Sequence, residues 1–567
     1  MKLAPLDISI VVGYVLLTLI AGLYLSRRAT KSVEDYFVGG RTLPWWLAGT
    51  SMIASAFAID TPLGIAGFVG KNGVQGVWFA WAYAIGGAGA FGAFVFAPLL
   101  RRSDIITTAE LVELRYSGRD AAILRGFKGV YFGVIAIAIQ MGWVIRSVLV
   151  LAQEAFGWDA TPTLAAIIAL TIIYTTASGF WGVAVTDFAQ FFIGGFGSLA
   201  LAIYAVRSAG GLGGVRAGLV KRLGAAEAER RLRFVPRPDD GFFKTFLVFI
   251  TLKWWGNPPS SVNQRIMSTR DERHATFSQT LFAAVHFGIN YWPMILVALV
   301  AIGRYPQLPL AKAEQGYALL LVNVLPTGML GLMLASLTAA FMSTVDTQAN
   351  TGASFMINDI YRRFIRREAD SKHYVRASQV ATVIMLALSV VVAYNMSSVK
   401  AAWEYLATLT AGYGFIAVAR WFWWRISARA EIAALVGSGL GSIIAAALKP
   451  QLPSYGARFA LVAAISTVMW VVVTLVSAPP PLEPLARFCR KVRPYPLGWG
   501  PVRERFPDIE WSAQLGRSVL MWIGGLAAIL ALNFGIGSAL LGSGVVGATL
   551  LALAAVGALL LVRYFRP

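Results

Sequence analysis

The stretch PWWLAGTSMIASAFAIDTPLG, residues 44–64, contains the features that decide the fold. It is apolar and long enough to cross a bilayer, which takes about 20 helical residues. It is also rich in small residues, and Pro62 removes a backbone donor and clashes with the carbonyl one turn earlier. We therefore expect a helix broken near Phe57 and Ala58. Freed carbonyls inside a membrane protein line a cavity or bind a ligand, so the break predicts a site. A merely kinked helix is the simpler alternative.

The rest of the chain repeats this membrane-length pattern. Its 567 residues are 57% hydrophobic and 14% charged, and long apolar runs alternate with charged breaks. We expect an all-α polytopic membrane protein with about 13–15 transmembrane helices. The expected helices lie near 8–26, 45–69, 74–100, 122–153, 161–178, 183–207, 241–257, 275–303, 315–352, 375–397, 402–424, 428–447, 457–477, 517–535 and 540–563.

Charge and cysteine content exclude several classes of function. The net charge is +21, but the basic residues stand between the apolar runs, so we interpret them as topological charge and expect no nucleic-acid partner. The single cysteine, Cys489, excludes a disulfide framework, and the three histidines lack the spacing of a zinc motif. We expect no cofactor and no metal other than a coupling ion.

The basic loops also predict the orientation. Clusters around 27–28, 101–102, 265–273, 362–367, 425–429 and 487–493 fall on one side if the N-terminus is outside, which puts the C-terminus in the cytoplasm. The protein would then lie in a bacterial-type inner membrane. One loop disagrees, because the basic residues of 208–240 would lie outside. We interpret this loop as a small extracytoplasmic cap.

The same pattern divides the chain into five segments. We expect a leading helix and loop at 1–43, a ten-helix core at 44–426, and two further helices at 427–480. A basic cytoplasmic loop at 481–516 and two additional helices at 517–567 follow. Neither sizeable extramembrane stretch is long enough for an ordinary catalytic domain, so we expect function to reside in the helices.

A polar stripe follows one face of the expected helix at 315–352. Ser343, Asp346, Thr347 and Asn350 stand at i, i+3, i+4 and i+7, with Thr344 beside them. Sodium prefers about five or six oxygen ligands, and hydroxyls with carboxylates supply them. The alternative is a helix that packs through small residues and satisfies its hydroxyls on its own backbone. That alternative leaves Asp346 unexplained.

Two more carboxylates stand inside apolar runs, where a charge costs about 2.5–3.5 kcal/mol. Asp60 follows the expected break. Asp187 stands near a helix start, where the helix dipole alone favours a carboxylate. The alternative for Asp187 is a station on the path of an ion to the cytoplasm.

In sequence the chain resembles the sodium-solute symporter family, which includes sodium/galactose, sodium/proline and sodium/sialic acid symporters. The resemblance spans about residues 5–480 and rests on several pieces in order: 35–46, 179–190, Gln264-Arg265, and 343–350 with 358–361. It implies a LeuT-type core of five plus five inverted helices, with one helix before it and others after.

The resemblance also implies ion sites. The main sodium site would use carbonyls and hydroxyls of Ala54, Phe57, Ala340, Ser343 and Thr344. A second cation, or the ion's exit path, would involve Asp187, Asp346 and Thr347, together with Ser343. The position of Asp346 is often a hydroxyl residue in the family. The added carboxylate favours a second cation, and a proton shared with Asp187 would also serve.

The candidates for solute binding follow from the same core: Asp60, Thr61, Gln140, Trp143, Lys253, Trp254, Asn257 and Tyr413. Lys253 would bind a solute carboxylate or pair with Asp60. His286 is interpreted as a packing residue. The stretch WGNPPS at 255–260 departs from the family, so no known pocket is carried over, and a sugar, an amino acid and an organic acid all remain open.

We therefore expect a sodium-coupled symporter that imports a small polar organic solute by alternating access. Its partners would be the solute, Na+ and the bilayer, with a homo-oligomer left open. A proton-coupled transporter of the same fold is the nearest alternative. A transporter-like sensor would need a signalling extension, and none follows residue 563. An enzyme would need a clustered acid/base or metal constellation, so we expect none.

Overall fold

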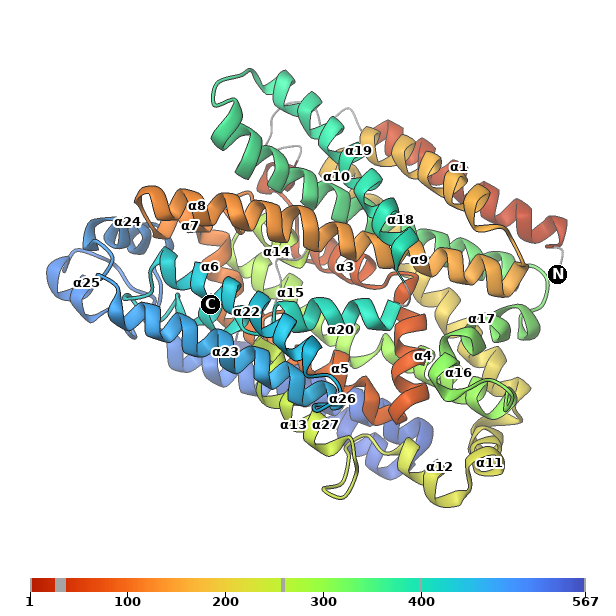
Figure 1. Cartoon of the computed structure of the whole chain (residues 1–567). Coiled ribbons are helices and arrows are strands. Elements are labelled where there is room, and N and C mark those ends of the chain that lie inside the picture. The colour runs from red at the N-terminus through yellow and green to blue at the C-terminus, as the bar shows by residue number, and fades with distance from the viewer. Residues whose placement is uncertain (1–2, 26–36, 256–260, 397–398, 565–567) are drawn as a thin grey trace.

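The computed structural model describes residues 3–25, 37–255, 261–396 and 399–564, with the backbone alone at 19, 21–25, 160, 167, 170, 172–182, 261 and 564. Every named element is a helix. Within the described residues, nine helices are long and apolar enough to cross a membrane, or ten with one bent pair. Most helices run between two ends of the molecule (Figure 1). One end holds the N-terminus and α11 (Gly211–Leu223), and the other holds α24 (Leu482–Val492) and α25 (Gly500–Arg505).

The remaining principal helices follow in chain order. They are α1 (Pro5–Leu25), α3 (Trp45–Ala56), α4 (Asp60–Asn72), α8 (Gly118–Lys128), α9 (Ile137–Phe156), α10 (Ala160–Ser208), α12 (Ala225–Leu232), α13 (Phe243–Thr251), α14 (Ser261–Met267), α15 (Glu272–Gly288), α16 (Tyr291–Arg304), α17 (Ala313–Val324), α18 (Met329–Ser354), α19 (Ser371–Asn395), α20 (Val399–Leu409), α21 (Tyr413–Ala419), α22 (Ala428–Ala447), α23 (Tyr455–Val476), α26 (Leu515–Leu541) and α27 (Gly544–Tyr564).

The expected broken helix is confirmed. α3 and α4 meet at an angle of 58° across three non-helical residues. The hydroxyl of Thr61 stabilises the break, because its Oγ1 accepts from the Ala58 amide at 3.2 Å and donates to the Ala56 carbonyl at 3.2 Å. Pro62 therefore lies in the first turn of α4, where a missing backbone donor costs nothing.

The prediction of one continuous helix at 74–100 is wrong. The segment consists of short 3-10 and α turns from Val74 to Ala84, a glycine-rich turn, a π-helical segment (Gly92–Phe96) and α6 (Ala97–Arg102). Close packing explains the interruption. A Cβ on Gly86 would lie 2.0 Å from the Trp254 carbonyl oxygen, so the two backbones touch here.

Other expected boundaries also differ. The segments 315–352 and 402–424, each expected as one helix, both consist of two helices. Pro326 and Gly328 separate α17 from α18. Gly412, between α20 and α21, approaches α23 closely. The helix expected at 241–257 ends at Thr251 and is followed by a 3-10 turn (Lys253–Trp255). Conversely, 161–178 and 183–207 form one helical element, α10, with no non-helical residue between them.

The two expected extramembrane segments are mainly helical and tightly held. In the cap, Arg231 of α12 donates to the Gly70 carbonyl at 2.8 Å, and Arg222 of α11 donates to the Tyr305 carbonyl at 3.0 Å. These arginines therefore satisfy carbonyls at the C-terminal ends of α4 and α16. Arg231 and Arg222 therefore have a structural role that does not depend on the side of the membrane on which the segment lies. The segment expected as a loop at 481–516 contains α24 and α25.

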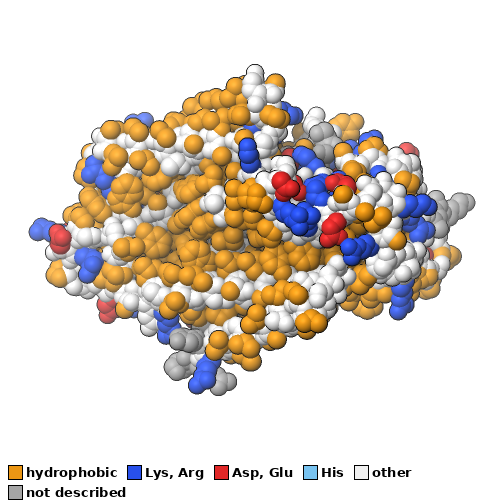
Figure 2. Space-filling model, turned by 90° about the horizontal axis from the view of Figure 1, so that it is seen from below, with side chains coloured by type: hydrophobic (Ala, Val, Ile, Leu, Met, Phe, Trp, Pro, Cys, Tyr) orange, Lys and Arg blue, Asp and Glu red, His pale blue; other side chains and the backbone are white. Residues whose placement is uncertain are grey.

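An apolar surface surrounds the core. α27 has only 11% of its most apolar window buried within the molecule, and large side chains such as Leu559 are 70% exposed. On the face seen in Figure 2, hydrophobic side chains cover the middle, and charged side chains gather toward the two ends. A surface of this kind faces lipid, so the chain is a multi-pass membrane protein.

Candidate functional site

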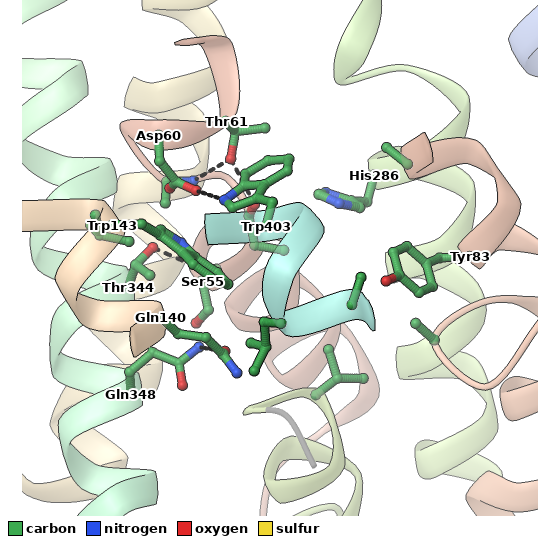
Figure 3. Close-up of a pocket in the computed structure, with 18 of the residues that line it drawn as sticks. Ser55, Asp60, Thr61, Tyr83, Gln140, Trp143, His286, Thr344, Gln348 and Trp403 are labelled. Atoms are coloured by element: carbon green, nitrogen blue, oxygen red, sulfur yellow. Dashed lines mark hydrogen bonds between the residues drawn. The ribbon is translucent and has the colours of Figure 1, made fainter. Parts of the chain in front are cut away.

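A cavity of about 260 Å³ lies beside the helix break. Its walls come from the break and α4, the segment before Gly86, α9, α15, the start of α16, α18 and α20 (Figure 3). Four of the predicted solute-binding residues line it: Asp60, Thr61, Gln140 and Trp143. The cavity therefore brings together side chains that are far apart in sequence.

Asp60 is held at the edge of this cavity by Trp403. The indole Nε1 of Trp403 donates to Asp60 Oδ2 at 3.1 Å. Gly64, one turn further along α4, leaves room for the indole, because a Cβ there would lie 3.1 Å from the ring. Asp60 is only 3% exposed, and its Oδ1 accepts no hydrogen bond from another described residue.

Two amides form a second polar point in the cavity. Gln348 of α18 donates from Nε2 to Gln140 Oε1 of α9 at 3.0 Å. The Oε1 of Gln348 has no donor among the described residues. This pair lies away from Asp60 (Figure 3). It can present both donors and an acceptor to a polar solute.

Aromatic side chains and one histidine complete the lining. The Trp143 and Trp403 rings lie 6.0 Å apart, and Tyr83 and Phe79 contribute further ring surface. His286 also lines the cavity, although it was predicted only to pack. Its Nε2 shares a hydrogen bond of 2.8 Å with the Tyr291 hydroxyl, whereas its Nδ1 has no partner among the described residues.

The other predicted solute-binding residues lie elsewhere. Lys253 is buried, and its Nζ donates to the Phe79 carbonyl and lies 3.4 Å from the centroid of the Tyr83 ring, so it pairs neither with Asp60 nor with any described carboxylate. Trp254 and Tyr413 line a smaller cavity of about 80 Å³, nearer to α6 and α21. Asn257 lies outside the described residues.

The end of α3 packs against α18 in the region that contains the residues predicted to bind sodium. The carbonyl oxygens of Ala54 and Phe57 accept no hydrogen bond from the described residues, because the break removes their helical partners. Ser55 ties the break to α18: its carbonyl accepts from Thr344 Oγ1 at 3.0 Å, and its Oγ donates to Thr347 Oγ1 at 3.1 Å. Ser343 and Ala340 lie on the same buried part of α18.

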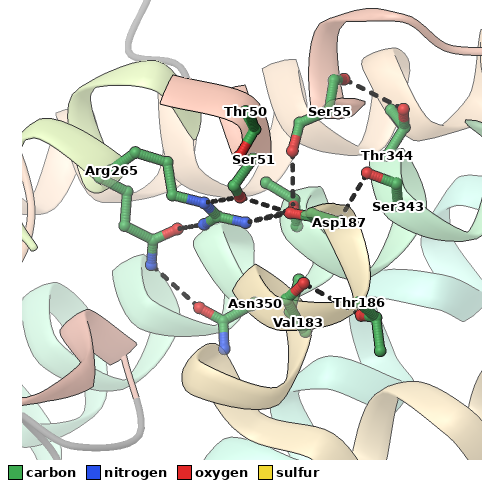
Figure 4. A network of polar contacts seen from close by, with 12 residues as sticks. Thr50, Ser51, Ser55, Val183, Thr186, Asp187, Arg265, Ser343, Thr344 and Asn350 are labelled. Carbon is green, nitrogen blue, oxygen red and sulfur yellow. Dashed lines mark hydrogen bonds and ion pairs between the residues drawn. The ribbon is translucent and has the colours of Figure 1, made fainter. Parts of the chain in front are cut away.

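Beside this point, Asp187 and Arg265 form a fully buried ion pair (Figure 4). Arg265 Nη2 donates to Asp187 Oδ2 at 3.1 Å and to Thr347 Oγ1 at 2.6 Å, and its Nε donates to Ser51 Oγ at 2.7 Å. Asp187 also accepts from Ser343 Oγ at 2.7 Å. The guanidinium therefore lies against two of the oxygen-bearing side chains expected to hold a second cation.

The rest of the polar stripe is buried in the same network. Asp346 is fully buried and acts electrostatically on Arg265 and Tyr14. Asn350 Oδ1 accepts from Gln264 Nε2 at 2.9 Å. The stripe is thus a packed polar face between α3, α10 and α14, and its hydroxyls bond across helices rather than only to their own backbone.

Sequence reasoning missed Trp403, Gln348, Tyr83 and Ser55 as parts of the site. Gln348 and Ser55 stand next to residues that were singled out, so the polar stripe and the break could have indicated them. Trp403 and Tyr83 carry no such signal, because a single aromatic residue in a membrane helix is ordinary core material.

Comparison with known proteins agrees with this architecture. The profile described as the sodium:solute symporter family matches residues 36–441. Sodium/glucose cotransporter 4 of Danio rerio is 26% identical over 421 residues, which cover 68% of this chain and 62% of that protein's length. The sodium/glucose cotransporter of Vibrio parahaemolyticus is 25% identical over 464 residues, covering 77% and 84%.

Among solved structures, a substrate-bound, outward-open Na+-coupled sialic acid symporter superposes with a TM-score of 0.67 at 20% identity. The match covers 85% of this chain and 100% of that chain. It shows that the fold is the LeuT-type core. Because the family profile extends from the residues before the broken helix into α22, the chain belongs to the sodium:solute symporter family.

Proposed function

We propose that the protein is a sodium-coupled symporter that imports a small polar organic solute. The observation that carries this proposal is the contact between the helix break, which has unbonded carbonyls, and the hydroxyl-bearing face of α18 through Ser55. Sodium would be held by the carbonyls of Ala54, Phe57 and Ala340 and the hydroxyls of Ser343 and Thr344. Hard oxygen ligands of this kind suit a hard cation.

Coupling between ion and solute follows from a shared wall. Thr344 belongs both to the proposed ion site and to the lining of the 260 Å³ cavity. Ser55 also lines the cavity, and its carbonyl accepts a hydrogen bond from the Thr344 hydroxyl. A sodium ion that joins the break to α18 would fix this wall and complete the solute cavity. The ion then favours the state in which the solute binds best, which is the condition for coupled transport.

The second set of predicted ion residues supports an exit path rather than a second resident cation. Arg265 already donates to Asp187 and Thr347, so a guanidinium supplies the positive charge there. We propose that this ion pair closes the route from the sodium site toward the end that holds α24 and α25, and that it opens as the core rocks. Sodium would then leave past Asp187.

The proposed setting is a bacterial-type inner membrane, with the N-terminus outside and the C-terminus in the cytoplasm. The transport core would be 44–426, with the α11–α12 cap outside and α24 and α25 in the cytoplasm. The named relatives are transporters, so the proposed activity is transport and not catalysis. The proposed partners are Na+, the solute and the bilayer.

Thermal stability of the purified protein in sodium chloride and in potassium chloride tests the ion site. A ligand that binds only the folded state stabilises it by about 1.4 kcal/mol at ten times its Kd. We expect a sodium-specific rise in Tm, and we expect Ser343→Ala to abolish it. Ser354→Ala is the matched control, because Ser354 is equally buried on α18 but donates to the Thr351 carbonyl of its own helix. An unchanged sodium response in Ser343→Ala would show that the ion binds elsewhere.

A further inference from the structure

The charge balance of the solute cavity identifies a chemical class of solute. Asp60 is the first residue of α4, and the positive end of this helix favours its ionised form. Burial without a cation opposes this form, whereas the helix dipole supports it. The dipole does not account for Oδ1, which is buried beside the cavity and accepts no hydrogen bond from another described residue. A carboxylate that keeps one oxygen without a donor lacks part of its stabilisation.

No lysine or arginine among the described residues forms an ion pair with the Asp60 carboxylate. Among the described residues, neither lysine nor arginine lines the cavity, and Asp60 takes part in no ion pair. The nearest candidate by sequence expectation, Lys253, is directed to the Phe79 carbonyl and the Tyr83 ring. His286 lines the cavity, but its Nε2 is engaged with Tyr291. The described lining therefore contains one carboxyl group and neither a lysine nor an arginine to pair with it.

The walls around Asp60 also suit a positive group. Trp143 and Trp403 line the cavity on the side of Asp60, and aromatic faces attract cations as well as apolar groups. The rings of Tyr83 and Phe79 already contact the Lys253 ammonium. The volume of about 260 Å³ limits the occupant to a small solute. At a separate point, the Gln140–Gln348 pair offers hydrogen bonds to a polar substituent.

We propose that the solute carries a protonated amine whose N–H group donates to Asp60 Oδ1, with Trp403 holding the other carboxylate oxygen. This inference rests on the proposed function and deepens it, because it selects an amine-bearing cation or zwitterion over a neutral sugar or an organic anion. A neutral hydroxyl compound would leave the carboxylate charge uncompensated. An organic anion would meet the same carboxylate with no lysine or arginine in the described lining to offset the repulsion.

Matched pairs of compounds test the proposal directly. Tm is measured in sodium chloride with millimolar L-alanine against L-lactate, putrescine against 1,4-butanediol, and with D-galactose. We expect at least one amine-bearing member to raise Tm while its hydroxyl counterpart does not. A response confined to D-galactose, butanediol or lactate, or no response to any amine, overturns the proposal.

Variants of Asp60 assign the effect to this residue. Loss of a hydrogen bond to a charged group corresponds to an affinity roughly 10- to 100-fold weaker, and we expect this loss for the responding amine in Asp60→Asn. Asp60→Glu, which retains the charge, should keep the preference for amines over their hydroxyl counterparts. An amine affinity unchanged in Asp60→Asn overturns the proposal.

The sodium response separates this inference from the proposed function. We expect Asp60→Asn to keep the sodium-specific rise in Tm, which also shows that the variant is folded. If the sodium response disappears in this variant but not in the parent protein, Asp60 acts in the ion site and the amine proposal fails. If the parent protein itself shows no sodium response, sodium coupling fails, whereas the amine preference is still read from the compound pairs in potassium chloride.

Discussion

Removing one member of the buried Asp187–Arg265 pair should destabilise the protein strongly. Both side chains are fully buried, so Arg265→Met leaves the Asp187 carboxylate without its cation in a low-dielectric interior. Breaking a buried pair in this way costs about 3–5 kcal/mol. Arg265→Met also removes the donors to Ser51 and Thr347, so we expect a value toward the upper end of this range.

The measurement is a double-mutant cycle with Arg265→Met, Asp187→Asn and the double variant. Unfolding of the purified protein in mixed micelles, with a denaturing detergent as the titrant, gives each free energy. The double variant should be more stable than the sum of the two losses predicts, with a coupling of about 3 kcal/mol, which is more than 100-fold in an equilibrium constant. Asp346 acts electrostatically on Arg265 and partly compensates its charge when Asp187 is neutralised, so Asp187→Asn should lose less stability than Arg265→Met.

A surface pair provides the control for this cycle. Arg429 Nε and Asp120 Oδ2 are 2.6 Å apart, but their side chains are 64% and 40% exposed. The same cycle with Arg429→Met and Asp120→Asn should give a coupling of at most about 1 kcal/mol. If the buried pair gave no larger coupling than this surface pair, the argument that Arg265 compensates Asp187 would be refuted.

Two further predictions concern packing and the cap. Gly86→Ala should lower Tm sharply or prevent folding, because its Cβ would lie 2.0 Å from the Trp254 carbonyl oxygen. Gly439→Ala, in the interior of α22 with no atom within 4 Å of the new Cβ, should leave Tm unchanged or raise it slightly. Equal Tm values for the two variants would contradict the close approach at Gly86. In the cap, hydrogen bonding from Arg230 lowers the pKa of Glu227 below its ordinary value of 4.5. The ionised Glu227 therefore stabilises the folded protein in full above pH 4.5, and this stabilisation is lost as the pH falls through the pKa of Glu227 in the folded state. Acidification should then lower the Tm of the wild type more than that of Glu227→Gln. The difference should correspond to at most about 1 kcal/mol. Parallel Tm profiles for the two proteins below pH 4.5 would show that this pair contributes nothing.

The sequence by itself determined the membrane architecture and the position of the break. Apolar length decides which segments can cross a bilayer, and Pro62 cannot stand in the interior of a continuous helix without the loss of a hydrogen bond, whatever surrounds it. The same local signals indicated Ser343, Thr344 and Asp187, because a polar residue inside an apolar run is costly unless it meets a partner, a cavity or an ion. The interruptions at Gly86 and Gly412 had no such signal, since they depend on the approach of Trp254 and Ser466 from distant segments.

Only the tertiary structure decided which polar groups meet. By sequence, Lys253 suited Asp60 and a solute carboxylate equally well, but the fold directs Lys253 to the Phe79 carbonyl and gives Asp60 the indole of Trp403. Likewise, Arg265 belongs by sequence to a basic cluster and to a family motif, yet it pairs with Asp187 inside the core. The physical reason is that a buried charge takes the partner that packing places within hydrogen-bonding reach, and side chains 343 residues apart, such as Asp60 and Trp403, become neighbours only when the chain has folded.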